Sequence, residues 1–299
     1  MKNWYKALVF FGLLLATSCT EDIVIDVEKG DTMFGVEAYF SDEMKRHEAI
    51  LSYTADFYNQ DEIRMVSGAT VYITDGVDTI VYHEDMENRG HYFTDSVAGK
   101  RNTLYRLCID ISATDDEPIQ LFSESMLSDN IDHIDSLVIK PYNGYNDTMP
   151  TVFFDDTIEW VYPYFQSLPD PNITYMPLIY KNDTLLTDSL IQQSIIPVGG
   201  YAGYYINGPE MLAANNKEIP IYYFRKSTLK VGDRIRAGLQ SIPLDYLYFY
   251  YSVAMSSGSN PMMGAPANVT TNIQPSDKAT GWFMTTSVTS AETVFLDNY

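Results

Sequence analysis

Short runs in which apolar and polar positions alternate fill most of the chain. The runs are rich in Val, Ile, Thr, Tyr and Phe, and they are separated by Asp, Asn, Gly and Pro. Successive side chains of a strand point to opposite faces, so alternation with a period of two is typical of half-buried strands. Long amphipathic patterns with the helical period do not occur. The pattern therefore predicts a mainly β protein.

The first group of runs predicts a β-sandwich domain over residues 34–128. Its strands are expected at residues 35–40, 48–53, 66–73, 79–82, 90–93 and 104–111. The Gly-Ala-x-Val, Gly-x-Tyr and Tyr-x-Leu strands occur in an order that resembles the small immunoglobulin-like or transthyretin-like sandwich domains. The alternative is any other meander of alternating strands.

The second group of runs predicts another β-rich domain over residues 129–299, with one or two short helices. Its strands are expected around residues 131–137, 152–154, 158–162, 175–180, 219–224 and 235–240. In the last of these, Ile235, Ala237 and Leu239 form the apolar face of a half-buried strand. The opposite face is expected to carry Arg234, Arg236, Gly238 and Gln240.

A helix is expected near residues 243–256, because apolar residues share one face there at helical spacing. These residues are Leu244, Leu247, Tyr248, Tyr251, Ala254 and Met255. Pro243 suits the first turn of such a helix, and residues 209–216 are a candidate for a shorter one.

The N-terminal residues show the three regions of a signal peptide. Lys2 and Lys6 come first, an apolar run follows at residues 7–15, and small residues at positions 16–18 precede Cys19. The apolar run is much shorter than the roughly 20 residues that a membrane-spanning helix needs. A cysteine directly after small residues resembles the lipobox of bacterial lipoproteins.

This resemblance predicts a signal peptide at residues 1–18, lipid attachment at Cys19 and a lipidated tether at residues 19–33. Ordinary secretory cleavage with an incidental Cys19 is the alternative. Glu21 and Asp22 follow the cysteine. Acidic residues here resemble the signal that sends lipoproteins of Bacteroidetes-type bacteria to the outer face of the outer membrane, although a solvated acidic start to the tether would look the same.

The chain is strongly acidic, with a formal net charge of −21. Removal of the leader would make the charge more negative still, because two lysines leave with it. Such a field repels phosphate backbones and anionic lipid surfaces, which argues against nucleic-acid binding. Acidic clusters such as residues 115–117 and 155–156 could bind calcium, but no spaced calcium-binding loop occurs, and solvated turns explain them.

The sequence contains partial catalytic motifs, but their residues do not have the spacing that catalysis requires. His47-Glu48 and His83-Glu84 begin like a zinc-protease helix, but Leu51 and Glu87 stand where the second histidine is needed. Cys108, the other cysteine, lies in a strand-like run and is expected to be a small buried residue. We therefore expect no enzyme, no metal site and no cofactor, although two carboxylates could still converge from distant strands.

Aromatic residues are the candidates for ligand binding. Trp160, Tyr162 and Tyr164 crowd near two prolines in an expected loop, and Tyr201 and Tyr204 follow a glycine pair. Flat rings on loops can stack against sugars or peptides, but the same rings commonly fill cores.

A recurring Asp followed by Thr or Ser and then an apolar residue resembles the O-glycosylation motif of Bacteroidetes exported proteins. Turn chemistry before a strand also explains this pattern. The hydroxyl residues are Thr32, Thr79, Ser96, Ser136, Thr148, Thr157, Thr184 and Ser189.

The C-terminal block gives the most specific resemblance. Residues 231–233, 266–273 and 281–283 carry Val-Gly-Asp, Pro-Ala-Asn-Val-Thr-Thr-Asn-Ile and Gly-Trp-Phe. With the lipobox, this block is similar to the Bacteroidetes lipoprotein family known as domain of unknown function 4249. Residues 274–277 replace the family's usual Gly-rich step.

The resemblance implies a surface lipoprotein that is often encoded beside a TonB-dependent outer-membrane receptor. We expect a non-enzymatic accessory binding protein, anchored by lipid to the outer membrane and facing the cell exterior, with that receptor as its partner. A stand-alone glycan- or peptide-binding module and a surface hydrolase are the alternatives.

Overall fold

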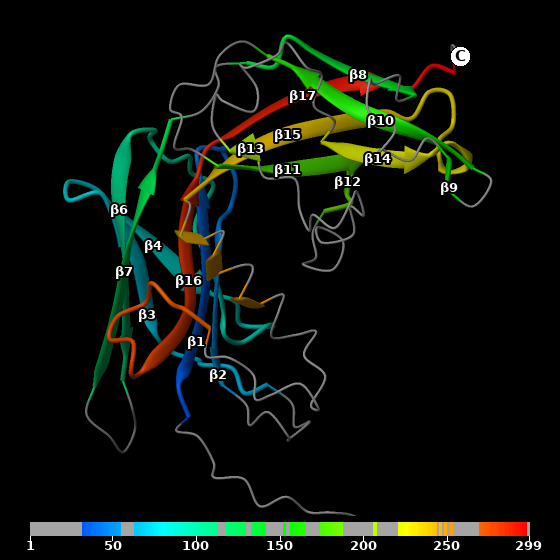
Figure 1. Cartoon of the computed structure of the whole chain (residues 1–299). Coiled ribbons are helices and arrows are strands. Elements are labelled where there is room, and N and C mark those ends of the chain that lie inside the picture. Colours follow the sequence, from blue (N-terminus) through cyan, green and yellow to red (C-terminus); the bar gives the residue numbers. More distant parts are fainter. Residues whose placement is uncertain are drawn as a thin grey trace, which may run out of the picture.

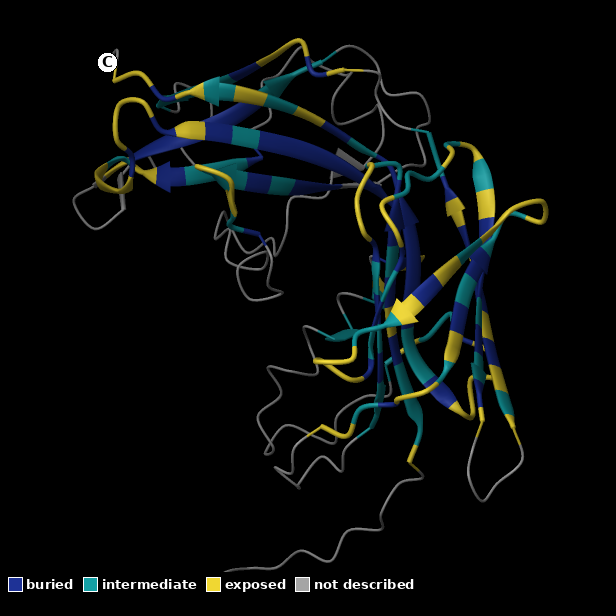
Figure 2. Ribbon diagram, turned by 180° about the vertical axis from the view of Figure 1, so that it is seen from behind, coloured by how far each residue is buried: buried dark blue, intermediate teal, exposed yellow. Residues whose placement is uncertain are grey.

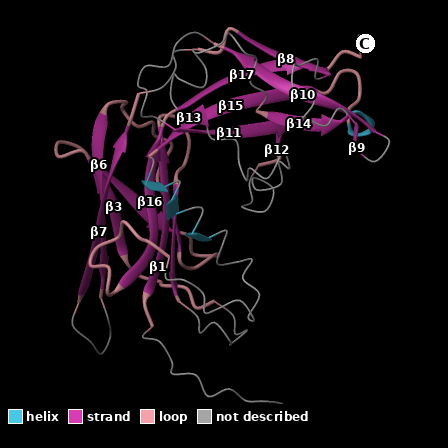
Figure 3. Cartoon of the chain, in the orientation of Figure 1, coloured by secondary structure: helices cyan, strands magenta, loops and turns pink. Residues whose placement is uncertain are grey.

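The computed structural model describes the chain in segments. These are residues 32–54, 63–112, 118–129, 133–141, 152–153, 156–165, 174–187, 206–207, 221–243, 245–246, 248–249, 252–253 and 269–297. Strands dominate these segments, as predicted, and they form three sheets (Figures 1 and 3).

The largest sheet, here called the rolled sheet, has eight strands. In spatial order they are β16 (Ala279–Thr286), β1 (Phe34–Ser41), β2 (Glu48–Tyr53), β5 (His91–Phe93), β4 (Thr79–Glu84), β3 (Thr70–Thr74), β6 (Thr103–Ile111) and β7 (Ile119–Leu127). Neighbouring strands are antiparallel except β1 and β16, which run parallel. The two end strands also meet, because the Thr285 backbone N–H on β16 donates to Ser125 Oγ on β7 at 2.9 Å.

The interior of the rolled sheet contains a single apolar core. On β3 and β6 the predicted alternation is observed, with Val71, Ile73, Leu107 and Ile109 fully buried. The sheet curves around these side chains, and strands such as β6 and β7 have one buried face and one exposed or half-buried face (Figure 2).

Strand β7 is not among the expected strands, and its burial pattern gives the reason. Its inward positions include the buried Ser123 and Ser125, whereas Phe122 and Met126 point outward and are partly exposed. Polar residues on the dry face and apolar residues on the wet face remove the alternation that identifies a strand.

Two smaller sheets pack face to face and form what is here called the upper sandwich (Figure 1). One comprises β12 (Thr184–Leu185), β11 (Thr174–Lys181), β15 (Arg234–Ile242) and β17 (Val288–Val294), with β13 (Ile206–Asn207) beside β11. The other comprises β14 (Tyr222–Arg225), β10 (Asp156–Tyr164) and β8 (Ser136–Pro141), with β9 (Val152–Phe153) beside β10. Their shared core includes Val161, Ile179, Phe224 and Leu239.

The division of the chain at residue 128 does not describe the sheets. Residues 279–286, placed by the sequence with the second part, form β16 and pair with β1 of the rolled sheet along eight registered positions from Phe34↔Ala279 to Ser41↔Thr286. A parallel pair between strands so far apart in sequence leaves no local pattern. After β16 a single residue, Ser287, leads into β17 of the upper sandwich.

Helical structure occurs where it was predicted. The residues described within 243–256 are helical at 245–246, 248–249 and 252–253. Tyr246 of this segment packs edge-on against Trp282 of β16, with ring centroids 6.0 Å apart. Residues 226–228 form a short 3₁₀ turn, η1 (Lys226–Thr228). The shorter helix expected at 209–216 lies outside the described residues.

Asp233 anchors the start of β15 and gives a prediction on acid stability. Its carboxylate accepts hydrogen bonds from Asn182 Nδ2 and the Lys230 backbone N–H, both at 2.8 Å, and lies 3.0 Å from Lys181 Nζ. The Asn182 hydrogen bond is the largest of the effects that lower the pKa of Asp233 to about 2.

We expect Asp233→Asn to lower the free energy of unfolding by roughly 2 kcal/mol at neutral pH. A carboxylate whose pKa is lowered by folding stabilises the fold at pH values above its pKa in the unfolded chain, which is about 4. This contribution disappears as the pH falls toward 2. The variant should therefore lose less stability than the native chain between those pH values, as measured by urea unfolding. Exposed Asp277→Asn is the control, and an equal response of both variants to acid would contradict the prediction.

Candidate functional site

The junction between the rolled sheet and the upper sandwich is held together by buried hydroxyl groups. Ser241 Oγ on β15 lies 2.7 Å from Ser287 Oγ, and Thr286 Oγ1 donates to the Ser241 carbonyl at 2.6 Å. All three side chains are almost completely buried. Hydrogen bonds of this kind fix the passage of the chain from β16 to β17, because each buried hydroxyl needs its partner.

Arg101 links both parts from the other side of the junction. Its Nε donates to Asp42 Oδ2 at 2.7 Å, and its Nη2 lies 3.5 Å from Thr289 Oγ1 on β17. The other oxygen of Asp42 accepts the Val288 backbone N–H at 2.8 Å. This network joins the residue after β1, the segment before β6 and the start of β17. Charged hydrogen bonds with defined geometry therefore connect the two parts of the fold.

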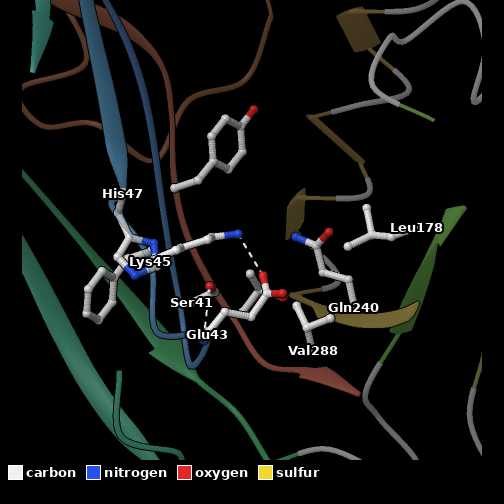
Figure 4. A pocket seen from close by; sticks show the side chains of 10 residues that line it. Ser41, Glu43, Lys45, His47, Leu178, Gln240 and Val288 are labelled. Carbon is white, nitrogen blue, oxygen red and sulfur yellow. Dashed lines mark hydrogen bonds and ion pairs between the residues drawn. The ribbon is translucent and has the colours of Figure 1, made fainter. Parts of the chain in front are cut away.

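A small pocket lies at this junction, with a volume of about 60 Å³ (Figure 4). On one side lie the end of β1 and the hairpin after it, and on the other lie β11, β15 and β17. The residues that line it are Tyr39, Phe40, Ser41, Glu43, Lys45, His47, Leu178, Gln240, Thr286 and Val288. The pocket therefore lies where the two parts of the fold meet.

Gln240 is the unusual residue of the pocket wall. It is only 8 % exposed, yet among the hydrogen bonds of the described residues none involves its side-chain amide. Figure 4 shows this side chain opposite Glu43 and Lys45. Buried amides are normally satisfied by protein or water, so this one is available to a ligand.

The charged groups of the wall cancel. Lys45 Nζ and Glu43 Oε2 form an ion pair at 2.6 Å. His47 is 3 % exposed, and its Nε2–H donates to the Val97 carbonyl at 2.8 Å. Burial lowers the pKa of His47, so the ring is neutral at neutral pH. The pocket is consequently a neutral, hydrogen-bonding site in an acidic protein.

Within the described segments, no group of three or more His, Cys, Asp or Glu side chains is placed to hold a metal ion. The pocket wall offers a carboxylate, an ammonium, an amide and hydroxyls. The carboxylate is already paired with the ammonium, and the imidazole donates to a backbone carbonyl. This arrangement suits binding rather than proton transfer.

The aromatic candidates are placed differently from the expectation. Trp160, Tyr162 and Tyr164 lie in strand β10 and not in a loop. Trp160 and Tyr162 are 0 % and 2 % exposed and pack in a cluster with Tyr222 and Tyr223. Rings this deeply buried act as core, the alternative already considered, and Tyr164 is half-buried beside them.

Other predicted site residues divide into two groups. Cys19, Tyr201, Tyr204, Thr148 and Ser189 lie outside the described residues. The remaining hydroxyl residues of the Asp-Thr/Ser pattern are all exposed: Thr32, Thr79, Ser96, Ser136, Thr157 and Thr184. Exposure is what modification of these hydroxyls requires.

Sequence reasoning missed Gln240, which it placed on the polar face of a half-buried strand. The structure buries both faces of β15 from Gly238 to Ile242, because the rolled sheet covers the face that would otherwise be wet. The one local signal was the end of alternation after Gln240, where Ser241 and Ile242 interrupt it. That signal does not identify what covers the strand.

No helix in the described segments has the length and apolar character needed to cross a bilayer. A family model with the description "Domain of unknown function (DUF4249)" matches residues 20–292. A search of curated proteins returned no match to the chain.

Proposed function

The chain belongs to the DUF4249 family, and from this premise we propose that it is a lipid-anchored surface protein that binds a ligand for a TonB-dependent outer-membrane receptor. In this proposal the protein is not an enzyme and needs no cofactor. Its role is to capture or present a nutrient.

The observation that carries a binding role is the neutral pocket, in which the side-chain amide of Gln240 has no hydrogen-bond partner among the described residues. Ligand sites are concave and contain a few polar groups that fix the orientation of the ligand. The pocket has this character, and its walls come from both parts of the fold. Movement of one part relative to the other would change the site, which gives a receptor a way to control binding.

Two features support the anchor. The family match begins at residue 20, directly after the lipobox cysteine. The acidic chain gains no electrostatic attraction to an anionic membrane surface, so attachment depends on acyl chains.

The receptor partnership is tested by extracting outer membranes in mild detergent and isolating the tagged lipoprotein. We expect one TonB-dependent receptor to be recovered with it in a fixed ratio, as measured by quantitative mass spectrometry. Recovery of the lipoprotein alone, under conditions that preserve established receptor complexes, would contradict the partnership.

Stand-alone binding is the second candidate, because every residue that lines the pocket belongs to this chain. A stand-alone module would bind a peptide or glycan with the same affinity whether or not the receptor is present. Titration of the purified chain with and without its membrane partner separates the two roles.

Glycosylation is proposed for the exposed hydroxyls of the Asp-Thr/Ser pattern. Mass spectrometry of the protein from its native host is expected to find glycans on several of Thr32, Thr79, Ser96, Ser136, Thr157 and Thr184, all of which are exposed. Thr70, which is exposed but follows Ala69, is the internal control. Unmodified hydroxyls at all six positions would remove the proposal.

A further inference from the structure

We infer that the junction pocket binds a neutral amide group, supplied by a peptide main chain or by an Asn or Gln side chain, which pairs with the amide of Gln240. This inference rests on the proposed function, since it names the ligand chemistry of the same pocket.

The first argument is hydrogen-bond complementarity. The Gln240 side chain offers an acceptor oxygen beside a two-proton donor nitrogen. It is nine-tenths buried and unpartnered among the described residues, and it lines the pocket. The primary amide of an Asn or Gln side chain presents the same two groups in the reverse order, so that pair forms two hydrogen bonds at once. A main-chain amide is trans, and it uses either its N–H or its C=O on Gln240. A carboxylate would lack the donor, and an ammonium group would lack the acceptor.

Size gives the second argument. The pocket volume is about 60 Å³. One water molecule needs roughly 10–15 Å³ of such space, so the pocket holds about four to six water-sized atoms. A carboxamide with its adjoining carbon has four heavy atoms, whereas a pyranose ring with its hydroxyls is far larger. The pocket therefore accommodates one amide group and not a whole sugar.

Charge gives the third argument. The Glu43–Lys45 ion pair and the neutral ring of His47 leave the wall without net charge. The chain as a whole carries −21, which repels anionic ligands. Leu178 and Val288 add an apolar surface beside Gln240 that suits the methylene group next to an amide. The absence of net charge on the wall, the negative charge of the chain and the apolar surface beside Gln240 all favour a neutral, partly apolar ligand.

The test is a titration of the full lipidated chain in detergent micelles, followed by saturation-transfer NMR. Propionamide probes the side-chain amide and N-acetylalanine methylamide probes the main-chain amide. Propionate, which has the shape of propionamide with a negative charge, and methyl glucoside are the comparison compounds. We expect at least one amide probe to bind at least tenfold more tightly than propionate and methyl glucoside, and the tighter of the two amides assigns the source.

Gln240→Leu is expected to weaken amide binding at least tenfold without lowering the melting temperature, because no protein hydrogen bond is lost. The matched control is Gln120→Leu on the exposed face of β7, which should leave binding unchanged. Leu178→Trp fills the pocket from the same wall as Gln240 and serves as the second variant should Gln240→Leu not fold.

Equal amide binding by the native chain and Gln240→Leu, no binding of either amide, or tighter binding of propionate or the glucoside would each overturn the inference. Recovery of the receptor with the same variants keeps this result separate from the proposed function. A retained receptor complex without amide binding overturns the inference alone. Suppose that the native chain binds an amide probe. Loss of the receptor complex in Gln240→Leu then shows that the receptor supplies the amide. A receptor complex retained by Gln240→Leu shows that a soluble peptide supplies it.

Discussion

Gly281→Ala is expected to destabilise the protein by more than about 3 kcal/mol and to separate β16 from β1. Gly281 has φ of +107°, a backbone conformation that L side chains rarely adopt. An added Cβ would lie 1.9 Å from the carbonyl oxygen of Val36, its registered partner on β1. Because that oxygen belongs to the backbone, the parallel strands themselves must move apart.

Gly232→Ala is the matched control for this prediction. Gly232 has a similar φ of +96°, but an added Cβ would meet nothing within 4 Å. The control should therefore lose only the conformational strain, roughly 1–2 kcal/mol. Chemical unfolding measures both variants, and hydrogen exchange of the β1 amides reports the lost pairing. Equal destabilisation of the two variants would contradict the steric argument.

The strands that the sequence predicts well are those with local alternation. Residues 48–53, 79–82 and 104–111 form strands close to the expected bounds. In the last of these, the buried Leu107 and Ile109 alternate with partly exposed neighbours. Strand β7 escaped prediction because Ser123 and Ser125 face the core. The hydroxyl of Ser125 is satisfied there by Thr285 of β16, a partner that no local pattern can show.

The candidate site is harder to predict than the strands, because it depends on contact between distant segments. From the local sequence Trp160 was a candidate ligand-binding residue, yet it is buried in the structure. Gln240 reads as solvent-facing, yet the rolled sheet covers it. Trp160 is buried beside Tyr222 and Tyr223 of the neighbouring strand β14. Gln240 is buried where β15 meets the end of β1 and Thr286 of β16.

Cys19→Ala is expected to remove the protein almost completely from the outer-membrane fraction. A single acyl chain gives only marginal membrane binding, and several chains together give stable attachment. The proposed anchor places several acyl chains on Cys19, and the acidic chain offers no basic patch to compensate for their loss. Metabolic labelling with palmitate and membrane fractionation measure the effect.

The control is Cys108→Ala, which removes the other cysteine, half-buried on β6 and remote from the leader in sequence. This variant should keep both the label and the membrane location. Retention of palmitate by Cys19→Ala would show that lipid is attached elsewhere, and the tether at residues 19–33 would then lose its role. Loss of the label together with loss of receptor recovery would instead show that the anchor brings the protein within reach of the receptor.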